Sequence, residues 1–251
     1  MPPAILIAVI ATLLCLVPRP VRAFGESGVF DPRVLIVGTA KFDGLRSTAP
    51  ARFSWELTRR TSAPARLAPE IVRADSHTLL SEPFAWWIGD KDPGELHPRE
   101  IGMLRQFFAL GGVLLVDESE PDKKDFTRGA KRELGRVIPD IAPIAIGTEH
   151  VVFRSFYLLR RAEGRVAGSP KLEAIVRNGA TQVLFSSHDL AGALAQYPSG
   201  SPVFPVTPGG EPQREMAIRL SINVAMYVLC TNYKDDQVHA PFLMRRRARD
   251  F

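Results

Sequence analysis

The chain has 251 residues, of which 45% are hydrophobic and 24% are charged. This composition excludes an intrinsically disordered chain, and the length suits one large folded domain or two small ones. Two cysteines are too few for a disulfide framework. The formal net charge of +5 suggests an anionic partner. Where the excess positive charge lies along the chain therefore decides where such a partner would bind.

The amino-terminal segment predicts export. Residues 4–17 form an apolar run that contains one polar residue, Thr12; the run is too short to span a bilayer and matches the core of a signal peptide. Because Val21-Arg22-Ala23 follows, we expect cleavage before Phe24 and a periplasmic or membrane-associated protein, with an uncleaved anchor as the alternative. The predicted organisation is a signal peptide over residues 1–23, a single domain over 24–244 and an arginine-rich tail over 245–251.

The excess positive charge lies in the two terminal segments. The predicted signal peptide contains Arg19 and Arg22, and the body between the two segments is formally neutral. A weak contact with an anionic membrane surface is therefore expected only at the tail, with a merely solubilising end as the alternative. The charged residues of the tail are Arg245, Arg246, Arg247, Arg249 and Asp250.

Four short segments are predicted to be buried strands. Each is apolar on both faces, which is typical of strands covered by helices on both sides. They are Val34–Val37, Phe84–Ile88, Val113–Val116 and Val183–Phe185. The segments Val151–Leu159 and Ser169–Arg177 are weaker candidates for further strands.

Helical patterns alternate with these strands. The clearest is Pro98–Leu110, where apolar residues recur on one face and Gly111 and Gly112 end the pattern. The alternation predicts an α/β fold, with a doubly wound, mostly parallel sheet and helices on both of its faces. The other helices are expected over Arg52–Thr61, Gly129–Val137, Leu190–Gln196 and Glu215–Asn232.

Two features accompany the last predicted helix. The segment Pro198–Pro212 before it is rich in Pro, Gly and Ser, and such a long loop is either a functional lid or a plain insertion. Cys230 lies within the helix and is the only cysteine after cleavage. We expect its thiol to be buried, because exported proteins face an oxidising environment.

Polar and ionisable residues follow the predicted strands. In an open parallel sheet, the loops at the carboxyl ends of the strands converge around a crevice where ligands bind. We therefore expect a binding crevice for a small ligand or an envelope protein, with ordinary solvated turns as the alternative. The candidate ligand-binding residues are Thr39, Lys41, Asp90, Asp117, Glu118, Ser119, Ser187, His188 and Asp189.

Three of these residues are candidates for catalysis. Asp117 and Glu118 are like charges at a sheet end, which predicts a raised pKa for one of them. His188 titrates near neutrality, so the three groups suit general acid–base chemistry. The same groups can instead hold a polar ligand by hydrogen bonds, and Asp189 can instead be the N-cap of the following helix.

Known catalytic and cofactor motifs are absent from the sequence. It contains no GxGxxG or P-loop phosphate motif, no GxSxG elbow and no HExxH. The five histidines are dispersed, so we predict neither a metal site nor a cofactor. Aromatic and basic residues do not interleave along any predicted helix, which leaves nucleic-acid binding without support.

The ordered segments together resemble the bacterial "domain of unknown function 4159" family, from about Pro32 to Arg247. The segments that carry the resemblance are Pro83–Gly89, the helix Glu100–Gly112, Leu114–Glu118, Ser155–Leu158, Ser186–Leu190 and Asn223–Arg247. The resemblance implies a flavodoxin-like fold similar to class I glutamine amidotransferases, in proteins that are exported or joined to membrane segments. It implies no established activity.

The resemblance also bears on catalysis. Enzymes of the amidotransferase-like superfamily place a cysteine at a strand-to-helix elbow, whereas the comparable exit here reads Val116-Asp117-Glu118-Ser119. His188 departs from the family's usual Ser-x-Asn-Asp-Leu strand exit. We therefore expect an exported, non-catalytic binding module, and the alternative is a hydrolase that uses Asp117 or Glu118 with His188.

Overall fold

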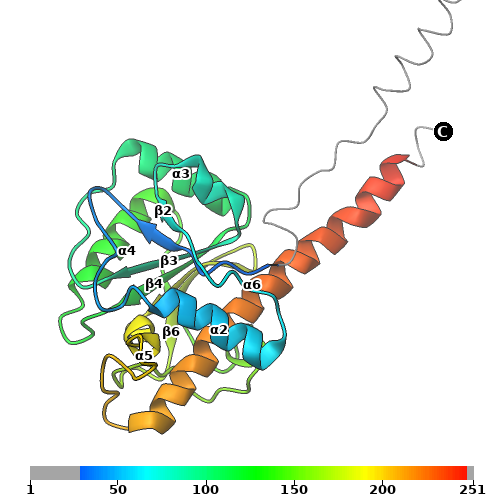
Figure 1. The fold of residues 1–251 in the computed structure, drawn as a ribbon. Helices are drawn as coiled ribbons and strands as arrows, with labels where there is room; N and C mark the ends of the chain where they lie inside the picture. The colour runs from blue at the N-terminus through cyan, green and yellow to red at the C-terminus, as the bar shows by residue number, and fades with distance from the viewer. Residues whose placement is uncertain (1–28, 248–251) are drawn as a thin grey trace, which may run out of the picture.

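A seven-stranded sheet organises the molecule in the computed structural model, which describes residues 29–247 (Figure 1). The strand order is β2-β1-β3-β4-β7-β6-β5. The first five strands in this order are parallel, whereas β6 runs antiparallel to both of its neighbours. The strands are β1 (Val34–Ile36), β2 (Ile71–Arg73), β3 (Phe84–Gly89), β4 (Val113–Glu118), β5 (Ile144–Ile146), β6 (Leu172–Arg177) and β7 (Ala180–Ser186).

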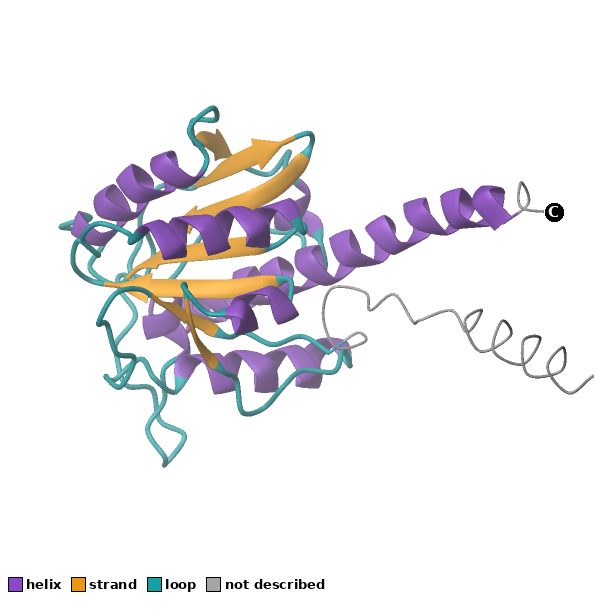
Figure 2. Ribbon diagram, turned by 90° about the horizontal axis from the view of Figure 1, so that it is seen from above, coloured by secondary structure: helices purple, strands orange, loops and turns teal. Residues whose placement is uncertain are grey.

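Helices cover both faces of the sheet. One face packs against α2, α5 and α6 and the other against α3 and α4, as Figure 1 and Figure 2 show. This arrangement confirms the predicted doubly wound, mostly parallel α/β fold. The helices are α2 (Ala49–Thr61), α3 (Pro98–Ala109), α4 (Asp125–Val137), α5 (Leu190–Leu194) and α6 (Gly210–Arg247), with short 3-10 helices at His77–Ser81 and Val151–Arg154.

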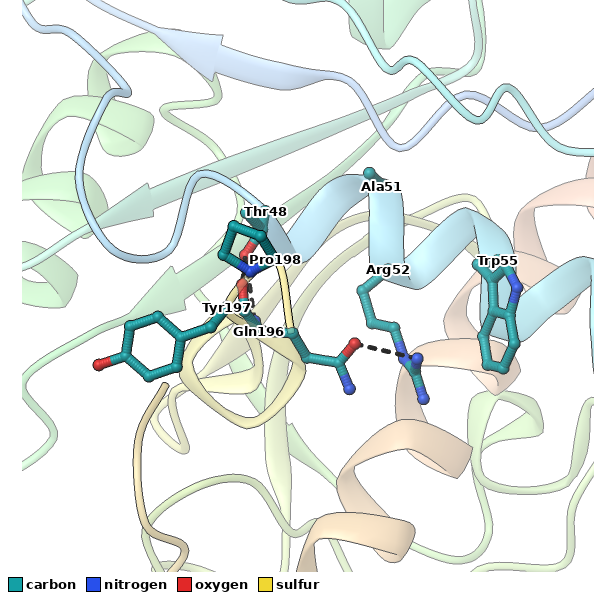
Figure 3. Close-up of a pocket in the computed structure, with 7 residues that line it drawn as sticks. All are labelled: Thr48, Ala51, Arg52, Trp55, Gln196, Tyr197 and Pro198. Atoms are coloured by element: carbon teal, nitrogen blue, oxygen red, sulfur yellow. Dashed lines mark hydrogen bonds between the residues drawn. The ribbon is translucent and has the colours of Figure 1, made fainter. Parts of the chain in front are cut away.

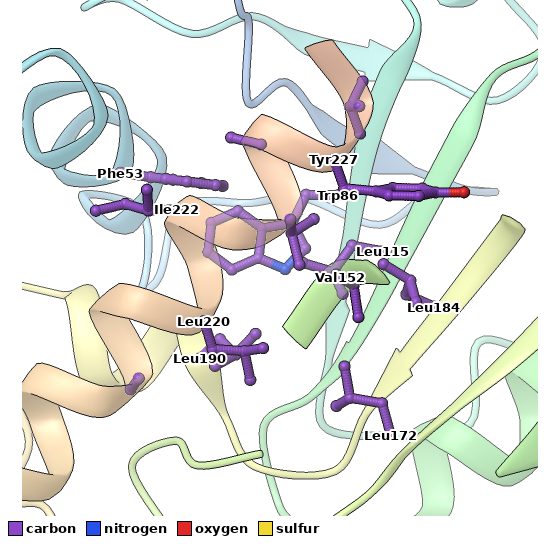
Figure 4. Close-up of a cluster of buried hydrophobic side chains, with 14 of the residues drawn as sticks. Phe53, Trp86, Leu115, Val152, Leu172, Leu184, Leu190, Leu220, Ile222 and Tyr227 are labelled. Atoms are coloured by element: carbon purple, nitrogen blue, oxygen red, sulfur yellow. The ribbon is translucent and has the colours of Figure 1, made fainter. Parts of the chain in front are cut away.

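Strand β3 sends alternate side chains into two separate cores. Trp86 packs with α2 and α6, whereas Trp87 packs on the opposite side with α3 and α4, because successive strand side chains point to opposite faces. Figure 4 shows the first core, where Phe53 of α2 lies beside Trp86 and Ile222 of α6 belongs to the same cluster. The rings of Phe53 and Trp86 meet edge to face with centroids 5.7 Å apart. Burial on both faces explains why the strands are continuously apolar.

All four predicted buried strands are present, and Ser169–Arg177 contains β6. The prediction of a strand in Val151–Leu159 is wrong, because Val151–Arg154 forms a 3-10 helix. Asn223 of α6 explains this path. Its amide donates to the carbonyls of Val152 and Tyr157, both at 2.8 Å, and accepts the Tyr157 N–H at 2.7 Å. These bonds satisfy backbone groups that a strand would pair within the sheet.

Helix α6 is longer than the predicted helix Glu215–Asn232. It begins at Gly210 and continues to Arg247, so three arginines of the predicted tail are helical. The carboxyl-terminal part of the helix extends away from the sheet (Figure 1, Figure 2). The predicted signal peptide and Arg249 lie outside the described residues.

The predicted burial of Cys230 is wrong, because its side chain is exposed on α6. The core contacts of this helix end with buried Val228 and partly buried Leu229. Cys230 is therefore one residue beyond the packed part of the helix. Within the described part of the chain, no helix is both long and apolar enough to span a bilayer.

Candidate functional site

The candidate residues lie on loops at one edge of the sheet, where the parallel strands end. The chain leaves β1 toward β2 and leaves β3 toward β4, so the winding direction switches between β1 and β3. Thr39, Lys41 and Asp90 lie on exposed loops at this edge. The candidates that follow β4 and β7 are different, because most of them are buried.

Asp117 is fully buried at the end of β4 and holds the start of α5. Its Oδ1 accepts the Leu190 N–H at 3.0 Å and its Oδ2 accepts the Ala191 N–H at 2.8 Å. Burial, and after it the carboxylate of Asp189, raises the pKa of Asp117 to about 7, although the two backbone N–H groups oppose the rise. The sequence predicts repulsion from Glu118 as the cause of this rise, whereas the structure favours burial and Asp189.

Glu118 is also buried, and it caps helix α4. Its Oε2 accepts the Thr127 N–H at 2.9 Å and its Oε1 accepts the Glu120 N–H at 3.0 Å. Lys124, the N-cap residue of α4, provides no side-chain hydrogen bond to the helix. Glu118 therefore satisfies a backbone donor that the start of α4 would otherwise leave unpaired.

His188 is fully buried and binds a different loop. Its Nε2 lies 2.8 Å from the Ser169 carbonyl, so Nε2 carries the proton, whereas the buried Nδ1 has no hydrogen-bond partner. Burial lowers the pKa of His188, which favours the neutral ring. Among the described side chains, no hydrogen bond joins His188 to Asp117 or Glu118.

Asp189 is the N-cap of α5, one of the two interpretations that the sequence allowed. Its Oδ1 accepts the Gly192 N–H at 2.8 Å. The same carboxylate binds two arginines that sequence reasoning did not select. Arg46, from the β1–α2 loop, donates from Nε to Oδ1 at 2.8 Å and from Nη2 to Oδ2 at 2.7 Å. Arg165 donates from Nε to Oδ2.

The two guanidinium groups share further partners. Both donate from Nη2 to the Ser119 carbonyl, at 3.1 Å from Arg46 and 3.5 Å from Arg165. Both also lie over the Phe204 ring, with the guanidinium carbons 4.4 and 5.5 Å from its centroid. Their side chains are 18% and 17% exposed, so solvent reaches them. We call Arg46, Arg165, Ser119, Asp189 and Phe204 the arginine-pair cluster.

Sequence reasoning missed Arg46, Arg165 and Phe204 because three loops that are distant in the sequence bring them together. One signal was available: Phe204 is one of the few apolar residues in the Pro- and Gly-rich segment 198–212. The structure brings Ser119 and Asp189 of the predicted set into this cluster. Ser187 precedes Asp189 by two residues, and its side chain is partly buried.

A shallow groove of about 330 Å³ lies between α2 and residues 196–198 (Figure 3). Arg52 donates to the Gln196 side chain at 3.0 Å, and Trp55 and Tyr197 are exposed toward the two ends of the groove. None of the predicted site residues lines it. The lining residues are Thr48, Ala51, Arg52, Trp55, Gln196, Tyr197 and Pro198.

Residues 34–229 match the family model described as "Domain of unknown function (DUF4159)". The chain belongs to the DUF4159 family. The match runs from β1 into α6 and includes every member of the arginine-pair cluster. A comparison with curated proteins found no match to this chain. Among the described side chains, no group of three or more His, Cys, Asp or Glu residues is placed to hold a metal ion.

Proposed function

We propose that this DUF4159 protein is an exported, non-catalytic module that binds a ligand or a protein partner at the carboxyl-end edge of its sheet, in the cell envelope. The observation that carries this proposal is the use of the buried carboxylates. Asp117, Glu118 and Asp189 each accept hydrogen bonds on both oxygens. A carboxylate held in this way is a poor general base, because both of its oxygens already accept hydrogen bonds from groups of the protein.

The same bonds favour binding at this edge. They hold the starts of α4 and α5 and the two arginines in fixed positions, so less ordering is needed when a partner binds. The exposed loops with Thr39, Lys41 and Asp90 border this rigid part of the edge. The predicted signal peptide supports an envelope location, and the neutral charge of the body places no strong electrostatic demand on the partner.

Hydrogen-exchange mass spectrometry tests the binding edge. The full chain is compared alone and with envelope membranes of its host. We expect slower exchange in the loops 38–48 and 197–209 when membranes are present. The turn at Asn178 and Gly179, which joins β6 to β7 at the opposite edge, is the internal control and should not change. Unchanged exchange in both edge loops would contradict the proposal.

A hydrolase is the second candidate, and the raised pKa of Asp117 is the observation that favours it. A panel of ester, amide and glycosidic substrates tests this candidate directly. If Asp117 is a general acid or base, Asp117→Asn lowers turnover about 10²- to 10⁴-fold. Turnover that is absent, or equal in the wild type and this variant, eliminates the hydrolase.

A further inference from the structure

The arginine-pair cluster contains more positive charge than its internal anion neutralises. Two guanidinium groups, which stay charged at any physiological pH, share the one carboxylate of Asp189. Both donate to the same oxygen, Oδ2. Their other shared acceptor, the Ser119 carbonyl, is neutral, and burial favours the neutral form of the nearby Asp117. Asp117, and after it Glu120, adds a weaker attraction to Arg46 than Asp189 does.

Each guanidinium also has donors left over. The bonds of Arg46 and Arg165 use Nε and Nη2, and neither Nη1 group donates to any described residue. Because both groups rest on Phe204 and are tied to Asp189, their planes are fixed. The spare N–H groups therefore belong to two oriented cations in partial contact with solvent.

The loop that carries Arg165 is itself anchored. The Thr207 N–H donates to the Arg165 carbonyl at 2.9 Å, and the Arg165 N–H donates to the Asp189 carbonyl at 3.3 Å. Gln213 of α6 donates to the carbonyls of Gly164 at 2.7 Å and Thr207 at 2.9 Å. These bonds join the Arg165 loop to the Phe204 loop, so the cluster is formed before any ligand arrives.

We propose that the arginine-pair cluster binds an oxyanion, a phosphate or carboxylate group of the ligand or partner, through Arg46 and Arg165. This inference rests on the proposed function and names the chemistry of the group that is bound. Planar guanidinium groups present paired N–H donors that match both kinds of oxyanion. Asp189 neutralises only one of the two positive charges in the cluster, and a bound anion beside Asp189 would neutralise the other.

The Asp189 carboxylate then competes with the bound oxyanion for Arg46 and Arg165, so removing its charge should favour binding. Replacing Asp189 by Asn removes the negative charge but keeps an N-cap residue that tolerates the left-handed backbone at this position, where φ is 53°. Binding of an oxyanion should become tighter. A cluster with a purely structural role predicts lower stability for Asp189→Asn and no gain in anion binding.

Calorimetric titration of the full chain with inorganic phosphate is the experiment. We expect Asp189→Asn to bind phosphate at least about tenfold more tightly than the wild type, a change of about 1.4 kcal/mol. Arg165→Ala should weaken binding by a similar factor. Arg46→Lys keeps the charge and loses the planar fork, so it should also weaken binding, and it covers the case in which a truncation at Arg46 does not fold.

Asp92→Asn is the matched control. Asp92, on the loop after β3, forms a two-bond pair with Arg132 of α4, at 2.7 and 2.9 Å, and within the described part of the chain no hydrogen bond or ion pair joins either residue to the cluster. Its replacement changes the net charge by the same amount and also releases an arginine, yet it should leave phosphate binding unchanged. Equal tightening by Asp92→Asn, or the absence of phosphate binding in both the wild type and Asp189→Asn, overturns the inference. Protection of the edge loops by membranes would then still support the proposed function.

Vesicles of phosphatidylglycerol identify the source of the anion. If the anion is a lipid headgroup, the wild type binds these vesicles, Arg46→Lys weakens the binding and Asp189→Asn strengthens it. If the anion belongs to a soluble ligand, the same ranking appears only in the phosphate titration. Vesicle or phosphate binding that is the same in all three proteins would contradict a role for the arginine pair.

Discussion

At the scale of single residues, Asp117 has its raised pKa because β4 ends inside the sheet, where water cannot hydrate a carboxylate. The folded chain therefore holds the Asp117 proton more tightly than the unfolded chain, where an aspartate has a pKa of about 3.9. The stabilisation that this proton provides is complete below about pH 4 and is lost as the pH rises through about 7.

This pH dependence can be measured against the variant Asp117→Asn, whose side chain does not titrate. The free energy of unfolding of the wild type relative to the variant should be larger at pH 4 than at pH 8, by about 1.4 kcal/mol for each unit of pKa shift. Urea denaturation of both proteins at the two pH values measures the difference. The same relative stability at both pH values would show that Asp117 titrates as it does in the unfolded chain.

Gly164 has no room for a side chain, and this gives a second prediction at the residue scale. A Cβ atom at this position would lie 2.2 Å from the His188 carbonyl oxygen, which is backbone and cannot move away easily. Gly164→Ala should therefore lower the free energy of unfolding by about 1–3 kcal/mol. Gly135→Ala is the control, because Gly135 lies in helix α4 with open space around it. This variant should stabilise the protein by up to about 1 kcal/mol in the same thermal or urea unfolding assay.

At the scale of elements, α4 depends on a side chain from outside the helix. Glu118 of β4 accepts the Thr127 N–H of α4 and the Glu120 N–H of the connecting loop. Glu118→Gln keeps the shape of the side chain but directs an NH₂ group at one of these two donors. We expect a loss of about 1–3 kcal/mol in the free energy of unfolding and faster hydrogen exchange at the start of α4. Glu95→Gln, on an exposed loop, should change neither quantity.

The elements also show which patterns a sequence can reveal. Strands β3 and β4 were predictable, because burial on both faces produces a continuous apolar run. The segment Val151–Leu159 was not, because Asn223, about 70 residues later, determines its path. Asp189 was predictable as a cap, since an N-cap depends on its immediate neighbours.

At the scale of the whole molecule, the strand order places loops from distant parts of the chain at one edge of the sheet. The alternation of elements and the polar residues that follow the strands predicted this edge as the candidate site. They did not predict the arginine pair. The chain between β5 and β6 places Arg165 at Asp189, after β7, and the same carboxylate binds Arg46 of the loop after β1. Contacts of this kind have no local signal in the sequence.

The most direct test of the binding edge is a map of backbone amide shifts in the full chain during titration with inorganic phosphate. An oxyanion site at the arginine-pair cluster predicts that the largest shift changes fall at residues 44–48, 163–167 and 203–206 and that they are larger in Asp189→Asn. Changes that spread evenly over the exposed arginines, or that gather on the opposite edge near Asn178, would contradict it.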